Sequence, residues 1–148
     1  MSFSNVTLWL PLSVTVGVQI FKFVWGLIYH RQLDFPTLFR TGGMPSSHSA
    51  MVTSLATAVA HREGVNSSLF AISIVLAAIV MYDAQGVRQQ SGKQARVLNR
   101  IVRELFKGHA VSEEELKELL GHTSFEVFVG ALVGIAYSLL WLLWILPA

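Results

Sequence analysis

A short stretch from Gly42 to Ala50 holds the side chains best suited to phosphate chemistry in this chain. It contains two glycines, a proline, three serines and a histidine, and it runs directly into an apolar segment. This pattern is typical of a tight turn opening a helix, with a serine as cap and Pro45 near the first helical position. The unpaired N–H groups of such a helix end attract anions, commonly phosphate, and His48 is close enough to donate a proton there. The alternative is an ordinary capped helix that carries a surface histidine.

A second candidate centre surrounds His122, which has a carboxylate four residues away on either side, at Glu118 and Glu126. At this spacing either carboxylate shares a helical face with the imidazole. A carboxylate bonded to one ring nitrogen fixes the tautomer and leaves the other nitrogen available as a base or nucleophile. Glu126 has a second reading, because Thr123 and Glu126 have the spacing of a capping box at a helix start. The two roles are compatible.

Arg88 and Lys93 could bind a phosphoryl group through their positive charges. Asp83 precedes Arg88 by five residues, and we interpret it as an ion-pair partner that orients the arginine rather than as a direct functional group. The chain has no cysteine and no pair of histidines at short ligand spacing. We therefore expect no metal and no other cofactor. A metal-dependent phosphatase that uses Asp83 and Glu118 is a rival hypothesis.

The elements that must position these residues are membrane helices. Hydrophobic residues make up 53% of the 148 residues and charged residues only 14%, and the mean hydropathy is +0.53. The sequence predicts an all-α integral membrane protein with a single membrane domain, a small helical bundle of three to four spans. Lys22 is the one charge in the first span and either reaches the interface or faces an interior site. The predicted spans are about 6–29, 45–60, 68–82 and 125–146.

The polar segment 83–124 is predicted to open with a turn at 83–88 and to continue as a helix from Lys93 to Lys107. That helix has an apolar side and a basic side, and we expect it to lie in the headgroup layer and attract anionic lipid. Its predicted lipid-surface residues are Arg96, Arg100, Arg103 and Lys107.

The distribution of lysine and arginine predicts the orientation. An outside N-terminus places the loops 30–43 and 83–124 in the cytoplasm with most of the cations. Both candidate centres then lie on one face of an inner or plasma membrane, facing the cytoplasm, so a single site built from distant stretches is permitted.

Several of these stretches resemble a known family. They are similar to the divergent branch of the phosphatidic acid phosphatase type 2 family, which is related to vanadium haloperoxidases. The likeness extends from about residue 40 to 135, and it rests on Gly42–Ala50, Tyr82–Arg88, Gly92–Ala95, Leu98–Asn99 and Gly121–Thr123.

The resemblance implies roles for these positions. His48 matches the general acid of the family, and His122 matches its nucleophile, with Glu126 as the carboxylate relay four residues later. The family's lysine motif with a following Arg-Pro is absent, and Glu126 stands where the wider family has aspartate. The residues implied at the phosphate are Ser46, Ser47 and Arg88.

We therefore predict a metal-independent lipid phosphate phosphatase acting on phosphatidylglycerol phosphate, phosphatidic acid or a polyprenyl phosphate. We expect it to act in the membrane and to bind no nucleic acid. Four small helices bury a polar site poorly alone, which favours a homodimer. The alternative function is a non-catalytic membrane protein that binds anionic lipid or a partner through the basic helix, with no use for His48 and His122 together.

Overall fold

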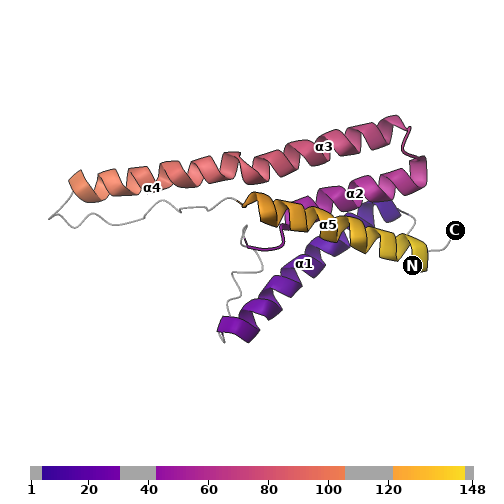
Figure 1. Cartoon of the computed structure of the whole chain (residues 1–148), viewed down its shortest axis with the longest axis horizontal. Coiled ribbons are helices and arrows are strands. Elements are labelled where there is room, and N and C mark those ends of the chain that lie inside the picture. Colours follow the sequence, from indigo (N-terminus) through magenta and orange to yellow (C-terminus); the bar gives the residue numbers. More distant parts are fainter. Residues whose placement is uncertain (1–4, 31–42, 106–121, 146–148) are drawn as a thin grey trace.

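The computed structural model describes residues 5–30, 43–105 and 122–145, without the side chains of His30, Val87, Arg88, Gln89, Ser91 and Arg103. The described residues form helices and no strand. In chain order these are α1 (Val6–His30), α2 (Ser47–Glu63), α3 (Ser68–Gln85), α4 (Val87–Leu105) and α5 (Ser124–Leu140), with a π-helical turn, η2 (Trp141–Ile145), at the end (Figure 1).

Three of the described helices are long and apolar enough to cross a membrane: Val6–Tyr29, Ser68–Gln85 and Ser124–Trp144. Each carries large apolar side chains on its outside, such as Val16, Ile72 and Phe128, each more than half exposed. Exposed apolar surface of this extent is expected where lipid, not water, surrounds the helices. The chain is therefore a helical membrane protein, as predicted.

The central helix is α2, which packs against α1, α3 and α5. It has 17 residues, many of them serine, threonine and alanine, and it is not among the three apolar spans. Small side chains let neighbouring helices approach closely within a membrane. The sequence predicted this packing role, although the helix continues to Glu63, beyond the predicted end at residue 60.

The contact between α2 and α5 is the closest in the bundle, and glycine makes it possible. A Cβ atom at Gly130 would fall on the carbonyl oxygen of Ser46, and one at Gly134 on that of Ala50. Further along, the Ser138 hydroxyl bonds the Ser54 hydroxyl at 2.7 Å. Both helices run in the same direction, since their starts meet at one end and their later turns meet at the other.

Helix α1 runs antiparallel to α2. Val14 and Val18 pack on Ala50 near the start of α2, whereas Leu10 packs on Ala58 near its end. The Tyr137 hydroxyl of α5 donates a hydrogen bond of 2.9 Å to Ser13 and joins α1 to α5. The chain termini therefore lie at the same end of the bundle (Figure 1).

The predicted turn at 83–88 is wrong, because α3 passes into α4 with little interruption. Gly86 adopts right-handed helical angles, its N–H bonds the Tyr82 carbonyl at 2.8 Å, and its carbonyl accepts from Gln90 at 3.1 Å. A glycine permits a break but does not impose one. Asp83 consequently lies inside the last turn of α3 instead of after it.

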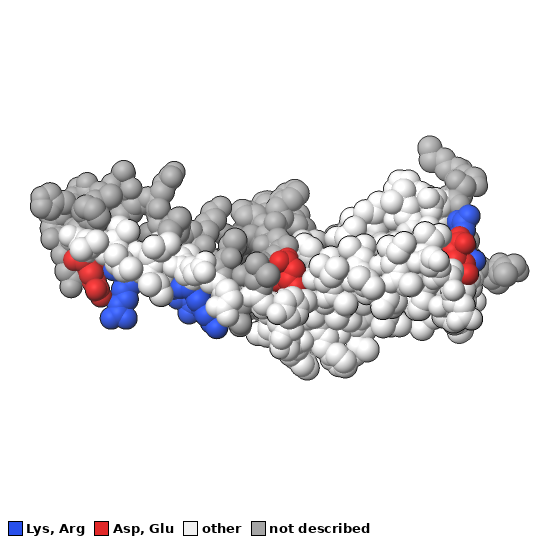
Figure 2. Space-filling view, turned by 90° about the horizontal axis from the view of Figure 1, so that it is seen from above, with Lys and Arg blue, Asp and Glu red and all other residues white. Residues whose placement is uncertain are grey.

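Helix α4 continues the line of α3 away from the bundle (Figure 1). Figure 2 shows charged side chains towards the two ends of the molecule, with a largely uncharged surface between them. Arg62 and Glu63, at the end of α2, form an exposed pair at 3.7 Å. The apolar side of α4 is uncovered, with Leu98, Ile101 and Leu105 at least 46% exposed. In this arrangement α4 extends outward, and lying in the headgroup layer would require bending at Gly86. Its interfacial position stays a prediction.

Candidate functional site

The glycine-proline-serine stretch forms the start of α2. Ser46 is fully buried, and its hydroxyl accepts the Ser49 N–H at 3.4 Å as the helix cap. The predicted serine cap is confirmed, with Pro45 one residue before the cap instead of inside the first turn. Ser47 is buried and His48 is half-buried in this first turn.

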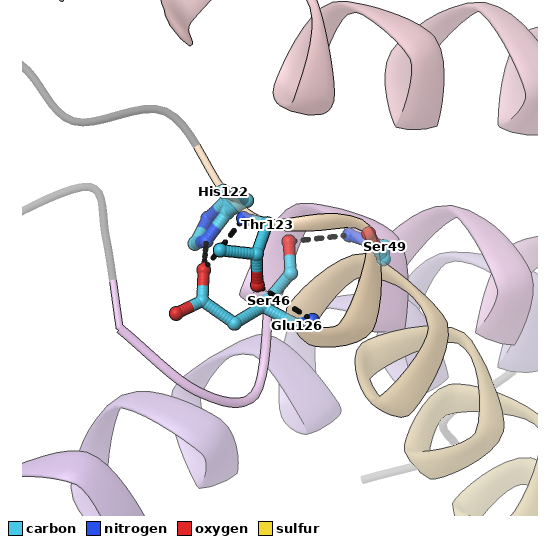
Figure 3. A network of polar contacts seen from close by, with 5 residues as sticks. All are labelled: Ser46, Ser49, His122, Thr123 and Glu126. Atoms are coloured by element: carbon cyan, nitrogen blue, oxygen red, sulfur yellow. Dashed lines mark hydrogen bonds and ion pairs between the residues drawn. The ribbon is translucent and has the colours of Figure 1, made fainter.

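The second candidate centre forms the start of α5. His122 is only 2% exposed, and its Nδ1 lies 3.1 Å from Oε2 of Glu126. The same oxygen accepts the Thr123 N–H at 3.0 Å, and the Thr123 hydroxyl accepts the Glu126 N–H at 3.3 Å (Figure 3). Glu126 therefore closes a capping box and also contacts the imidazole. The expected shared helical face is wrong, because His122 precedes the helix cap Thr123. The catalytic role of Glu126 stays a prediction.

The two centres meet. The Ser46 N–H donates to the Glu126 carbonyl at 3.2 Å, and the His122 N–H donates to the Ala84 carbonyl at 3.1 Å. The starts of α2 and α5 and the end of α3 thus converge at one end of the bundle, and Figure 3 shows the cap and the imidazole side by side. We call the group formed by Lys22, Ser46, His48, His122 and Glu126 the polar cluster.

Lys22 is the member of the polar cluster that sequence reasoning did not assign to the site. It lies on α1, is 9% exposed, and is close enough to the Glu126 carboxylate to interact with it electrostatically. Of its two sequence-based readings, the structure supports the interior one. The sequence signal for this role was that Lys22 is a single cation inside an apolar span. Charged residues at such positions are retained mainly for function.

Ser49 is a second residue that sequence reasoning passed over. It is fully buried in the first turn of α2, and within the described part of the chain its hydroxyl has no hydrogen-bond partner. A buried hydroxyl without a partner is unfavourable, so such a group at a candidate site is suited to bonding a ligand. No sequence signal distinguishes Ser49 from its neighbouring serines.

The other predicted phosphate ligands are less well placed or not described. Arg88 is the second residue of α4 and lies one helical turn after Ala84, the residue that His122 contacts, but its side chain is outside the described atoms. Lys93 is exposed on α4, which leads away from the polar cluster, so the structure does not bring it to the site. Asp83 is half-buried near the end of α3, and its pairing with Arg88 stays a prediction.

Of the predicted lipid-surface residues, Arg96 and Arg100 are exposed on α4. Arg100 pairs with Glu104 at 3.0 Å, an exposed contact of small energetic value. The side chain of Arg103 is not described, and Lys107 and Glu118 lie outside the described residues. Across 5–30, 43–105 and 122–145, no three histidine or acidic side chains are grouped to hold a metal ion.

Chemically, the polar cluster has the parts of an acid–base and anion site. The Glu126 carboxylate lies 3.1 Å from Nδ1 of His122, so Nε2 is the ring nitrogen that this contact leaves for acid–base or nucleophilic chemistry. The first turns of α2 and α5 present N–H groups at the same end, and Lys22 adds a cation. A phosphate group matches this combination of donors better than a neutral ligand does.

Comparison with known proteins agrees with these observations. No solved structure matches this chain. An uncharacterized membrane protein of Bacillus subtilis (strain 168), YuiD, is 44% identical over 147 residues, covering 92% of this chain and 93% of its own length. A family model described as the divergent PAP2 family matches residues 3–137, which include every member of the polar cluster. The chain therefore belongs to the divergent PAP2 family of membrane proteins.

Proposed function

We propose that this protein is a phosphatase of membrane lipid phosphomonoesters and that His122 is its nucleophile. The observation that supports this proposal most strongly is that Glu126 makes two separate contacts. Its carboxylate holds the imidazole of His122, and its backbone carbonyl holds the cap of the helix that carries His48. This contact supports a site in which two histidines from distant parts of the sequence act on the same phosphate.

The proposed reaction has two steps. Nε2 of His122 attacks phosphorus, the bond from phosphorus to the lipid oxygen breaks, and that oxygen takes the proton of His48. Water then attacks the phosphohistidine, His48 takes up the proton of the water, and inorganic phosphate leaves as the N–P bond breaks. The reaction needs no metal, because Lys22, Arg88 and the helix N–H groups balance the charge on the phosphoryl oxygens.

The headgroup must reach a histidine that is almost fully buried. The exposed members of the polar cluster are His48, which is half-buried, and Glu126, whose side chain is 23% exposed. We propose that the phosphate enters beside these two and that the hydroxyls of Ser46, Ser47 and Ser49 donate to it.

We further propose that the site faces the cytoplasm. The polar cluster lies at the end of the bundle where the chain continues into 31–42 and α4, the parts of the sequence rich in arginine and lysine. Substrates made on that leaflet, such as phosphatidylglycerol phosphate or phosphatidic acid, suit this orientation, and a polyprenyl phosphate is the alternative. We also propose that the protein forms a homodimer, because a bundle of this size buries a polar site poorly alone.

The competing function is binding of anionic lipid without catalysis. It is favoured by α4, whose apolar side is exposed and whose other side carries Arg96 and Arg100. A helix of this type binds membrane surfaces whether or not the polar cluster is reactive. Such a protein would not require a histidine held by a carboxylate beside a second histidine.

Phosphate release from lipid vesicles by the purified protein separates the two functions. His122→Asn places an amide near the position of Nδ1 and removes the nucleophile, and His48→Gln removes the acid. We expect each variant to lose activity by at least about a hundredfold. The control is His61→Ala, an exposed histidine at the far end of α2, which should retain activity.

A phosphohistidine trapped on His122 and identified by mass spectrometry would support the proposed nucleophile. Activity that survives in both variants would refute the catalytic assignment. Activity that disappears with EDTA and returns with a divalent cation would favour the metal-dependent rival.

A further inference from the structure

An open apolar groove runs beside the polar cluster on the membrane-facing part of the bundle. It lies between α1 and α5, has a volume of about 270 Å³, and is lined by Val14, Gly17, Val18, Phe21, Val133 and Tyr137. The only side-chain polar atom among these is the Tyr137 hydroxyl, which bonds Ser13. The α1 residues of the groove extend from Val14 to Phe21, seven steps or about 10 Å of helix.

One end of the groove adjoins the candidate site. Pro45 also lines the groove, and it directly precedes Ser46, the cap beside Glu126. On α1, Phe21 lines the groove and the next residue is Lys22, which interacts with Glu126. The groove lining is therefore directly followed along the chain by members of the polar cluster, Lys22 on α1 and Ser46 at the start of α2.

The apolar groove and the polar cluster beside it together fit an amphiphilic ligand. An apolar chain with an anionic group at one end would place the chain along α1 and α5 and the anion at the polar cluster. A second protein helix would satisfy the apolar wall but not the polar end, since apolar helices carry no such charge. An ordinary membrane lipid would fill the groove without preference for phosphate.

We propose that the groove holds the apolar chain of the phosphorylated lipid whose phosphate lies at the polar cluster. This inference rests on the proposed function and adds a basis for substrate selection. The chain positions the phosphorus opposite His122, so phosphomonoesters with a long chain react faster than those with a short one. Small displacements of a reacting group lower rates strongly. A bulky side chain that fills the groove would displace the lipid chain and, with it, the phosphorus from its position opposite His122.

Gly17 offers a specific way to fill the groove. A Cβ atom at Gly17 meets nothing within 4 Å, so a larger side chain enters the groove without disturbing the helix packing. Gly26, also on α1, has equally open surroundings but does not line the groove. Gly17→Leu and Gly26→Leu therefore form a matched pair with the same chemical change on the same helix.

The first measurement is binding, which does not require turnover. The full-length protein in dodecyl maltoside is photolabelled with an alkyl phosphate that carries a diazirine within its chain, and labelled peptides are mapped by mass spectrometry. We expect labels on 14–21 and 133–137, competition by dodecyl phosphate, and at least about a tenfold loss of labelling in Gly17→Leu but not in Gly26→Leu. Labels spread evenly over α1, α3 and α5, unchanged in Gly17→Leu, would identify ordinary surrounding lipid and overturn the inference.

The second measurement is phosphate release from dodecyl phosphate and butyl phosphate. We expect Gly17→Leu to lower kcat/KM about tenfold for the long substrate and to leave the short one unchanged. Equal effects on both substrates would overturn the inference while the phosphatase function stood. If the wild type releases no phosphate from any substrate but labelling follows the groove, the phosphatase function fails and the chain-binding groove stands.

Discussion

Replacing Glu126 by glutamine tests the residue on which the whole polar cluster depends. The carboxylate accepts hydrogen bonds from His122 and Thr123 at 3.1 and 3.0 Å and interacts with the charge of Lys22. Glutamine has nearly the same size and can still accept a hydrogen bond, so the substitution removes the negative charge with little change in packing.

The expected loss of stability follows from these contacts. Hydrogen bonds to an ionised acceptor contribute about 1 kcal/mol more than neutral ones, which gives about 2 kcal/mol for the two bonds. Removing the charge facing the nearly buried Lys22 adds roughly 1 kcal/mol, less than the loss of a fully buried pair costs, because the Glu126 side chain is 23% exposed and solvent screens the interaction. A total of about 3 kcal/mol corresponds to a fall in Tm of roughly 6–12 °C for a chain of this size.

Thermal unfolding in detergent, followed by tryptophan fluorescence, measures this fall in Glu126→Gln, Lys22→Met and the double variant. The double variant should be more stable than the sum of the single effects predicts, by about 1 kcal/mol, because removing both charges leaves neither one unmatched. Glu104→Gln is the control, since its exposed pair with Arg100 should change stability by less than about 1 kcal/mol.

Strictly additive effects of the Lys22 and Glu126 substitutions would refute the reasoning, because they would mean that the two side chains do not interact. A fall in Tm for Glu126→Gln no larger than for Glu104→Gln would refute it as well. In the active protein, Glu126→Gln should also lower phosphate release by about a hundredfold, since the charge no longer stabilises the tautomer of His122.

Three further outcomes are expected. Gly134→Ala forces a Cβ atom against a backbone carbonyl of α2 and should lower the free energy of unfolding by about 1–3 kcal/mol, whereas Gly17→Ala should not lower it, as thermal unfolding of both will show. Thr123→Ala removes a helix cap and should lower it by about 1 kcal/mol, with Thr123→Ser restoring most of the loss. Arg96→Gln and Arg100→Gln should each weaken binding to anionic vesicles about fivefold in co-sedimentation, more at low salt than at high salt.

Much of the fold follows from the length of apolar runs in the sequence. The runs predicted α1, α3 and α5 to within a few residues, and the small side chains predicted α2 as a packed helix. The joint at Gly86 could not be predicted, because glycine is compatible with a turn and with a helix and only the surrounding packing decides. The direction of α4 depends on that single joint.

Part of the candidate site was likewise predictable from the local sequence, and part depended on how the helices pack. The cap at Ser46 and the pairing of His122 with Glu126 are local. Residue type and spacing predicted a serine cap and a carboxylate partner, but they did not choose between Glu118 and Glu126. The meeting of the two centres depends on how closely α2 and α5 approach, which Gly130 and Gly134 determine. These glycines lie four residues apart in an apolar span, a recognised pattern for close helix contact. For Lys22 the single cation inside an apolar span indicated an interior role, but it did not show which helix α1 turns this side chain towards.

The parallel packing of α2 and α5 has an electrostatic consequence. Each helix start carries a partial positive charge equivalent to roughly half a proton, and the two starts coincide at the polar cluster. The opposing negative ends lie elsewhere: α1 continues to His30, about 12 Å beyond Lys22, and α3 leads almost directly into α4. This corner of the bundle is therefore electropositive through its backbone alone, and in the weakly screening membrane it draws an anionic headgroup inward before any side chain touches it.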